Sequence, residues 1–286
     1  MAEPARLTAD RVTDVITHHG EGPVWDPARH RLHLVDMLAG AVVTLDPTTG
    51  EHARLDVGSR VAAALRPRSG GGMVVAVERG FTLVDPDGTL HPQPELWSDA
   101  QVRMNDGGTD PDGRFYCGTM AYDAASGAGS FWRLDTDLTT HELFGDVTIS
   151  NGFAFSPDGS VAYYIDTPTG RVDVFDYSDG ALVNRRTAVP DAGHPDGMTV
   201  DAEGNLWVAD FGGALVRHFT PTGQLLTEVS VGARQVTACT FGGDDLATLY
   251  ITTSRQDLAD GEDPAAGSVF AVTPGVTGLP PLTFDA

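Results

Sequence analysis

Four polar residues of this 286-residue chain each stand five positions ahead of a turn signal. They are Glu21 before Asp26-Pro27, Asn105 before Asp110-Pro111, Asn151 before Ser156-Pro157, and Asp196 before Asp201-Ala202. If the four segments are repeats about one axis, these side chains occupy equivalent places and converge. Two carboxylates and two amide oxygens around one point are donors that a hard cation prefers. The spacing therefore predicts a cation site built from four separate segments.

The shared register matters because each pair alone has a simpler explanation. Pairs such as Asn151-Gly152 and Asp196-Gly197 commonly form turns. Turns placed for local reasons would not keep one spacing in four segments. Three protein ligands, Glu21, Asn151 and Asp196, would leave positions on a catalytic ion open for water and substrate. Asn105 would then lie nearer the substrate.

The turns belong to a repeat that covers the chain. Turn signals occur at intervals of 40 to 46 residues, near Asp26, Arg66, Asp110, Ser156, Asp201 and Gly243. Each precedes a short apolar strand, at residues 32–36, 73–77, 115–119, 162–166, 206–210 and 249–253. Four-stranded repeats of this length are typical of β-propeller blades. The pattern predicts an all-β, six-bladed β-propeller with four-stranded blades and a central metal site. The even spacing disfavours the alternative, a β-sandwich or barrel of many short strands.

The chain is expected to form a single domain over residues 1–286. The sixth repeat lacks a clear fourth strand after residues 270–273, and residues 11–17 are expected to supply it and close the ring. Cys117 and Cys239 fall in the third and sixth repeats, too far apart across such a ring for a disulfide. Both thiols are expected to be buried and reduced, in a cytoplasmic protein. The first ten residues lack the apolar stretch of a secretion signal.

The composition excludes several kinds of function. The chain has 40 acidic and 18 basic residues, a formal net charge of −22 and no lysine. Without lysine there is no Schiff-base mechanism, and the negative charge argues against nucleic-acid and membrane partners. The same charge also fits solubility or adaptation to high salt, so it does not identify the cation site. No Gly-x-Ser-x-Gly element or Cys-x-x-Cys pair is present, which disfavours a serine hydrolase and a thiolate zinc site.

Six short segments carry a resemblance to a known family. They are residues 20–25 (GEGPVW), 103–107 (RMNDG), 118–120 (GTM), 150–152 (SNG), 195–198 (PDGM) and 201–209 (DAEGNLWVA). In this order they resemble the gluconolactonase/regucalcin (senescence marker protein) family, including its luciferin-regenerating members. The resemblance implies a six-bladed propeller with one divalent ion in the channel, and hydrolysis of sugar lactones.

The resemblance also implies roles for individual residues. The residues that match the family's metal ligands are Glu21, Asn151 and Asp196. The residues that match its substrate contacts are Arg103, Asn105 and Asp123. At position 123 some relatives have the longer glutamate, so the preferred sugar is expected to differ.

The predicted function is metal-dependent hydrolysis of a sugar lactone by a gluconolactonase-like hydrolase of carbohydrate metabolism. The ion would polarise the lactone carbonyl and position water, and Asp196 would take a proton from that water. Calcium is the favoured ion, and zinc, magnesium, manganese and iron(II) also suit such ligands. The expected partner is a small-molecule sugar lactone, with the protein a monomer or weak oligomer. The alternatives are an organophosphate-hydrolysing calcium propeller and a non-enzymatic calcium-binding regulator.

Overall fold

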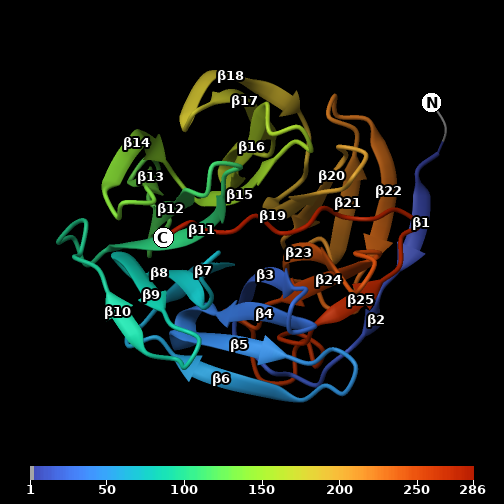
Figure 1. Ribbon diagram of the computed structural model, residues 1–286. Coiled ribbons are helices and arrows are strands. Elements are labelled where there is room, and N and C mark those ends of the chain that lie inside the picture. Colours follow the sequence, from blue (N-terminus) through green and yellow to red (C-terminus); the bar gives the residue numbers. More distant parts are fainter. Residues whose placement is uncertain (1–2) are drawn as a thin grey trace.

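Six small sheets surround a common axis, and each sheet is one blade of a β-propeller (Figure 1). The computed structural model describes residues 3–286. Within a blade, the strands that follow one another in sequence pair antiparallel, from an inner strand at the axis to an outer strand at the rim. The predicted all-β, six-bladed fold with four-stranded blades is confirmed.

The first three blades follow one another in the first half of the chain. Blade one contains β3 (Gly20–Asp26), β4 (Arg31–Asp36), β5 (Ala41–Leu45) and β6 (His52–Asp56). Blade two contains β7 (Ala62–Pro67), β8 (Met73–Val77), β9 (Gly80–Val84) and β10 (Leu90–Pro92). Blade three contains β11 (Val102–Thr109), β12 (Phe115–Ala121), β13 (Gly129–Leu134) and β14 (Thr140–Val147).

The second half of the chain forms the remaining blades. Blade four contains β15 (Ser150–Phe155), β16 (Val161–Asp166), β17 (Val172–Ser178) and β18 (Ala181–Val189). Blade five contains β19 (Pro195–Val200), β20 (Leu206–Asp210), β21 (Leu215–Phe219) and β22 (Leu225–Ser230). Blade six contains β23 (Val236–Gly242), β24 (Thr248–Thr253) and β25 (Phe270–Val272). Two short 3₁₀ helices, η1 (Met37–Ala39) and η2 (Thr167–Thr169), follow β4 and β16. None of the helices in residues 3–286 has the length and apolar character needed to span a membrane.

The N-terminal segment joins two blades rather than one. Strand β2 (Asp10–Arg11) pairs antiparallel with β25 and is the fourth strand of blade six. It is shorter than the expected strand over residues 11–17, because the Thr13 hydroxyl takes the place of a backbone acceptor for Val269 N–H at 3.0 Å. Strand β1 (Ala5–Thr8), which the sequence did not predict, lies parallel to β22 at the outer edge of blade five.

The apolar core consists of clusters between neighbouring blades. Trp25 of blade one stacks on Tyr250 of blade six, with ring centroids 5.9 Å apart. Trp207 of blade five meets Phe241 of blade six edge to face. Sheets that twist against one another in this way bury aromatic side chains on both faces. Cys117 and Cys239 are free thiols within these buried layers, in blades three and six.

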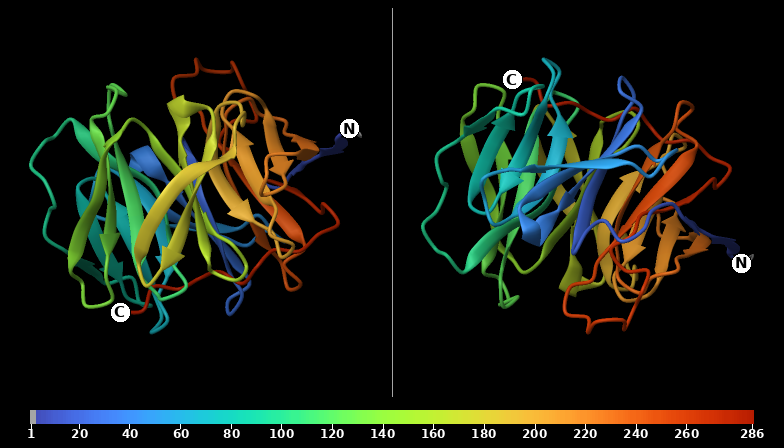
Figure 2. Two further views of the ribbon diagram at one scale, coloured as in Figure 1. Left: turned by 90° about the horizontal axis from the view of Figure 1, so that it is seen from above. Right: turned by 90° about the horizontal axis from the view of Figure 1, so that it is seen from below.

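The C-terminal segment crosses one flat face of the ring (Figure 2). The N–H of Gly278 donates to Leu246 O on blade six, and the N–H of Phe284 donates to Pro67 O on blade two, at 2.8 Å each. The Phe284 side chain is fully buried and belongs to the apolar cluster of blades one to three. The segment therefore links blades six and two over one mouth of the channel.

Candidate functional site

The inner strand of every blade has a β-bulge at the same place. In β3 the register shifts between Glu21 and Val24, so that two residues of β3 lie opposite one residue of β4. The same irregularity occurs in β7, β11, β15, β19 and β23. A bulge bends its strand and re-aims a side chain. In blades one, three, four and five the polar residue at the bulge lines the channel.

The glycines next to the site residues lie within inner strands that line the channel, and they are not turn residues. The Glu21-Gly22 and Asp196-Gly197 pairs lie inside strands β3 and β19. Gly22 has a φ of +51°, in the left-handed region that favours glycine. A Cβ at Gly197 would lie 2.5 Å from the Cβ of Ala238 on the next blade. A side chain there would push two inner strands apart and widen the site.

Aspartates at the ends of second strands hold the loops that lead into the site. Asp36 accepts the backbone N–H of His19 at 3.0 Å, two residues before Glu21. Asp166 and Asp210 accept backbone N–H groups of the loops that precede β15 and β19. The repeat thus supplies the bulge in every blade and the aspartate in blades one, four and five, which place Glu21, Asn151 and Asp196.

All six residues predicted for the site line one cavity of about 370 Å³. They are Glu21, Arg103, Asn105, Asp123, Asn151 and Asp196. They come from four blades and from both halves of the chain, as the repeat argument requires. Their individual roles stay predictions.

A chain of hydrogen bonds fixes the amide groups. Arg103 Nη1 donates to Asn105 Oδ1 at 2.7 Å, and Asn105 Nδ2 donates to Asn151 Oδ1 at 3.1 Å. Asn151 Nδ2 donates to the Thr167 hydroxyl at 2.7 Å, and this hydroxyl donates to Pro195 O at 2.8 Å. Because the hydroxyl proton is used on Pro195, Thr167 must accept from Asn151. The Asn151 oxygen is therefore directed at the channel rather than into the blade.

The two carboxylates of the site, Glu21 and Asp196, are both buried in the same cavity. Burial raises the pKa of Glu21 to about 8, and the nearby Asp106 carboxylate adds to this shift. Burial, followed by the charge of Glu21, raises the pKa of Asp196 well above its usual range. The Arg103 guanidinium opposes both shifts without cancelling them. In their ionised form these groups make a strongly negative site that a bound cation would stabilise.

Asp106 is a buried carboxylate beside the site that the sequence analysis did not single out. It is 5% exposed, and its charge raises the pKa of both Glu21 and Asp196. Burial raises the pKa of Asp106 itself, and Arg66 opposes this shift. Strict strand alternation puts Asp106 and Asn105 on opposite faces of β11, but the bulge between positions 104 and 107 removes that alternation. Its position next to Asn105 was the available signal.

Asp123 lies at the exposed rim of the cavity, on the loop after β12. Its carboxylate accepts the backbone N–H of Ala125 at 3.1 Å. The neighbouring Tyr122 ring lies 5.8 Å from the Arg103 guanidinium, and its hydroxyl donates to Glu78 at 2.6 Å. The rim of the cavity therefore carries a hydrogen-bond acceptor, the Asp123 carboxylate, and the buried Arg103 guanidinium is the donor nearby.

The donor set fits a hard divalent cation. Glu21 and Asp196 offer carboxylate oxygens, and Asn151 offers the amide oxygen that faces the channel. In the described part of the chain, residues 3–286, no group of three or more His, Cys, Asp and Glu side chains is arranged to hold a metal ion. The fit therefore depends on the amide oxygen as the third ligand.

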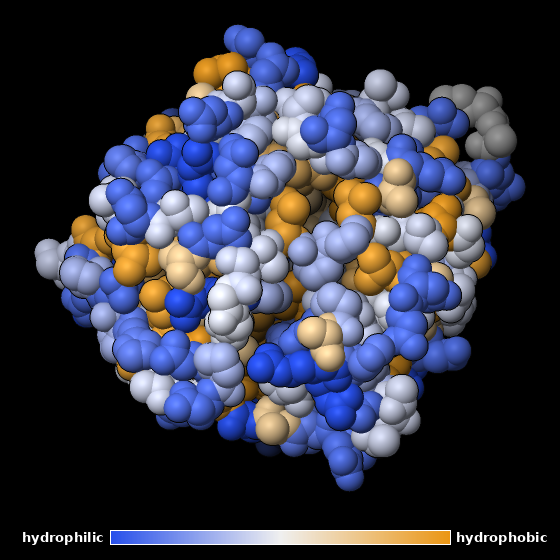
Figure 3. All heavy atoms as spheres, viewed as in Figure 1, coloured by the Kyte–Doolittle hydropathy of each residue, from blue (hydrophilic) through white to orange (hydrophobic). Residues whose placement is uncertain are grey.

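A second cavity, of about 470 Å³, opens at the other mouth of the channel. It lies beneath the C-terminal segment, and Leu279 and Leu282 line it together with Phe153, Phe155 and Phe241. The space-filling view from this side shows apolar residues around a hollow near the centre of the ring (Figure 3). None of the six predicted site residues lines this larger cavity, so size alone does not locate the chemistry.

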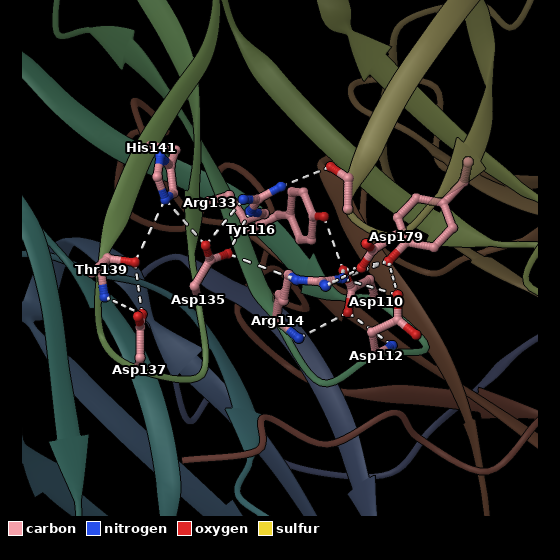
Figure 4. A network of polar contacts seen from close by, with 12 residues as sticks. Asp110, Asp112, Arg114, Tyr116, Arg133, Asp135, Asp137, Thr139, His141 and Asp179 are labelled. Atoms are coloured by element: carbon pink, nitrogen blue, oxygen red, sulfur yellow. Dashed lines mark hydrogen bonds and ion pairs between the residues drawn. The ribbon is translucent and has the colours of Figure 1, made fainter.

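A second cluster of charged groups joins blades three and four (Figure 4). The Asp110 carboxylate accepts hydrogen bonds from the Tyr116 and Tyr177 hydroxyls at 2.9 and 2.6 Å, and Arg114 pairs with it at 3.2 Å. Arg114 also pairs with Asp179 of blade four at 2.7 Å. Each carboxylate here has a donor, so the cluster connects blades and offers no free ligand set.

The fold and the cavity define a class of protein, a six-bladed β-propeller with a negatively charged polar site on its axis. A family model described as the SMP-30/Gluconolactonase/LRE-like region matches residues 19–255. The chain belongs to this family, as the sequence motifs predicted.

Relatives of similar length support the assignment. Regucalcin from Danio rerio is 37% identical, over 93% of this chain and 94% of its own length. The 6-deoxy-6-sulfogluconolactonase of Pseudomonas putida is 36% identical, over 91% of this chain and 92% of its own. The pentonolactonase of Haloferax volcanii is 35% identical, over 98% of this chain and 99% of its own.

A solved structure shows the same arrangement of blades. The crystal structure of a calcium-binding protein, regucalcin, from Agrobacterium tumefaciens superposes with a TM-score of 0.93. The two proteins are 27% identical, and the match covers the whole of both chains.

Proposed function

We propose that this protein is a sugar lactonase that depends on one divalent metal ion. The observation that carries the proposal is the pair of buried carboxylates, Glu21 and Asp196, which share one cavity with the amide group of Asn151. The names of two relatives, a sulfogluconolactonase and a pentonolactonase, support a sugar lactone as the substrate class.

Glu21, Asn151 and Asp196 would hold the ion in this proposal. When bound there, a divalent cation would polarise the lactone carbonyl and stabilise the negative charge that develops on its oxygen. The calcium-binding regucalcin structure supports calcium as the ion. Calcium also suits a set of three oxygen donors that leaves room for further ligands.

The remaining residues would bind the sugar and move the proton. Asp196 would accept a proton from the attacking water while it holds the ion, as a weaker base than the metal-free carboxylate, because the bound cation stabilises its ionised form. Arg103 donates hydrogen bonds to substrate oxygens and holds Asn105 through Nη1. Asp123 accepts hydrogen bonds from sugar hydroxyls at the rim. The two buried free thiols fit the reducing cytoplasm.

The test is a panel of five- and six-carbon aldonolactones, assayed by acid release after the protein is stripped of metal and then resupplied. Hydrolysis that is lost on stripping and returns with a divalent ion would support the proposal. Hydrolysis that persists without metal would overturn the metal role. Metal binding by calorimetry without turnover of any lactone would favour the regulator alternative.

A further inference from the structure

His19 is a polar residue of the cavity that the mechanism above does not use. It forms an isolated antiparallel bridge with Ser254, which links blade one to blade six. Its side chain is 6% exposed, yet it lines the same cavity as Glu21 and Arg103. His19 thus stands on a different wall of the cavity from Arg103, Asn105 and Asp123, which all belong to blade three.

The hydrogen bonds of Ser254 determine where the imidazole carries its proton. Ser254 is fully buried, and its hydroxyl oxygen lies 2.6 Å from His19 Nδ1. The same oxygen accepts the backbone N–H of Gln256 at 2.9 Å. Within residues 3–286 the hydroxyl proton has no acceptor other than His19 Nδ1. A buried hydroxyl that donated to nothing would lose a hydrogen bond, so Ser254 donates and Nδ1 accepts.

A neutral imidazole that accepts at Nδ1 carries its hydrogen on Nε2. Among the described residues Nε2 has no hydrogen-bond partner, and it is not among the buried, unsatisfied atoms. The Nε2–H group is therefore open to the cavity. The Nε2–H donor has a fixed position, because the backbone bridge to Ser254 and the Ser254 hydroxyl both hold the His19 ring.

We infer that His19 is a substrate-binding residue, whose Nε2–H donates a hydrogen bond to an oxygen of the bound sugar lactone. The inference rests on the proposed function. Ser254 acts as a positioning residue, since it selects the tautomer and does not reach the substrate itself. Together with Arg103 on blade three, His19 would grip the substrate from two sides. A polyhydroxylated ring offers oxygens in both directions, whereas a small apolar ester does not.

The direct test is the tautomer. Two-bond ¹H–¹⁵N correlation spectra of the full-length protein, with His19 assigned by its absence from the His19→Gln spectrum, should show hydrogen on Nε2. In Ser254→Ala this preference should weaken. Hydrogen on Nδ1 in the wild type would overturn the inference. This measurement needs no substrate, so it stands even if no lactone is hydrolysed and the proposed function fails.

A matched pair of variants tests the contact itself. Glutamine places an amide N–H near the position of Nε2, whereas asparagine reaches only as far as Nδ1. On the best lactone of the panel, kcat/KM of His19→Asn should fall about tenfold, the scale of one lost hydrogen bond, and His19→Gln should keep most of it. The exposed neighbour His18→Ala is the control and should match wild type. Equal values for wild type, His19→Gln and His19→Asn, or equal losses in both variants, would sink the proposal.

Discussion

The channel site and the network between blades three and four both bury carboxylates, but they balance charge in different ways. In the network, two tyrosine hydroxyls and Arg114 satisfy Asp110. In the channel, Arg103 Nη1 donates to Asn105 and to a backbone carbonyl. Burial raises the pKa of both Glu21 and Asp196, and the Asp106 charge adds to both shifts. A buried carboxylate with enough donors, such as Asp110, stabilises the fold. Buried carboxylates without enough donors, such as Glu21 and Asp196, indicate a ligand site.

Asp196→Asn should give the largest functional effect. Loss of the proposed base should lower kcat by about 10²- to 10⁴-fold, and metal affinity should fall with the lost charge. The metal-free variant should melt no lower than wild type, because the substitution removes a buried carboxyl group whose ionisation burial disfavours. Asp112→Asn makes the same chemical change in the network and should leave kcat unaltered. Unchanged metal affinity by calorimetry in Asp196→Asn would contradict the ligand assignment.

Arg114→Ala should show the reverse pattern. It removes the only charged partner described for the fully buried Asp110, which keeps its two tyrosine hydroxyls and two backbone N–H groups. We expect a loss of about 3 kcal/mol, the low end for breaking a buried ion pair, measured by denaturant unfolding. Activity per folded molecule should stay at the wild-type value. A large fall in kcat without a change in stability would mean that the network contributes to the site.

Arg103→Ala should lower kcat/KM by at least about tenfold, the scale of one charged hydrogen bond of roughly 1.5–3 kcal/mol. Arg103→Lys keeps the charge but loses the planar group that reaches both Asn105 and substrate. It should therefore recover little activity. Full recovery in the lysine variant would show that charge alone accounts for the role of Arg103.

The two clusters should also respond to pH with opposite signs. The pKa of Glu21 is raised from 4.5 to about 8, so the metal-free native state binds more protons than the unfolded state between these values. Stability of the metal-free protein should therefore fall as pH rises through this window, and Glu21→Gln should flatten the fall. Hydrogen bonds from Tyr177 and Arg114 lower the pKa of Asp112, so its stabilising contribution is lost as pH falls. Thermal melts of the metal-free wild type and of Glu21→Gln across this pH range would test the expectation.

The smallest effect is expected at the rim. Asp123→Glu extends the carboxylate by about 1.5 Å, one carbon–carbon bond. The ranking of five- and six-carbon aldonolactones by kcat/KM should change by a few-fold, while metal affinity stays constant. An identical ranking in wild type and variant would move the choice of sugar to another part of the rim.

The sequence predicted most of the scaffold because the repeat is written in local signals. Turn residues and short apolar runs depend on nearby chain, and the six second strands lie where the pattern predicted them. The shared spacing likewise brought Glu21, Asn151 and Asp196 to one cavity. The family and the sugar lactonase assignment agree with the family model and the named relatives.

Contacts that depend on ring closure were beyond local patterns. Thr167 orients Asn151 from a 3₁₀ turn, and Ser254 meets His19 across 235 positions of chain. The place of Asp106 beside the site was not predicted, because a bulge breaks the two-residue alternation on which strand predictions rest. Strand β1 was not predicted, because its partner β22 is more than 200 residues away and no pattern within residues 5–8 indicates this pairing.

The repeated bulge also bears on how such a site can change. Blades two and six have the same bulge, which begins at Ala62 and at Val236. The backbone therefore repeats the same bulge in all six blades, and beside it four blades place a polar side chain that lines the cavity. A new preference for metal or substrate can arise by exchanging a single side chain beside a bulge, with no change in the loops or the blades. A scaffold of this kind separates the evolution of chemistry from the evolution of the fold.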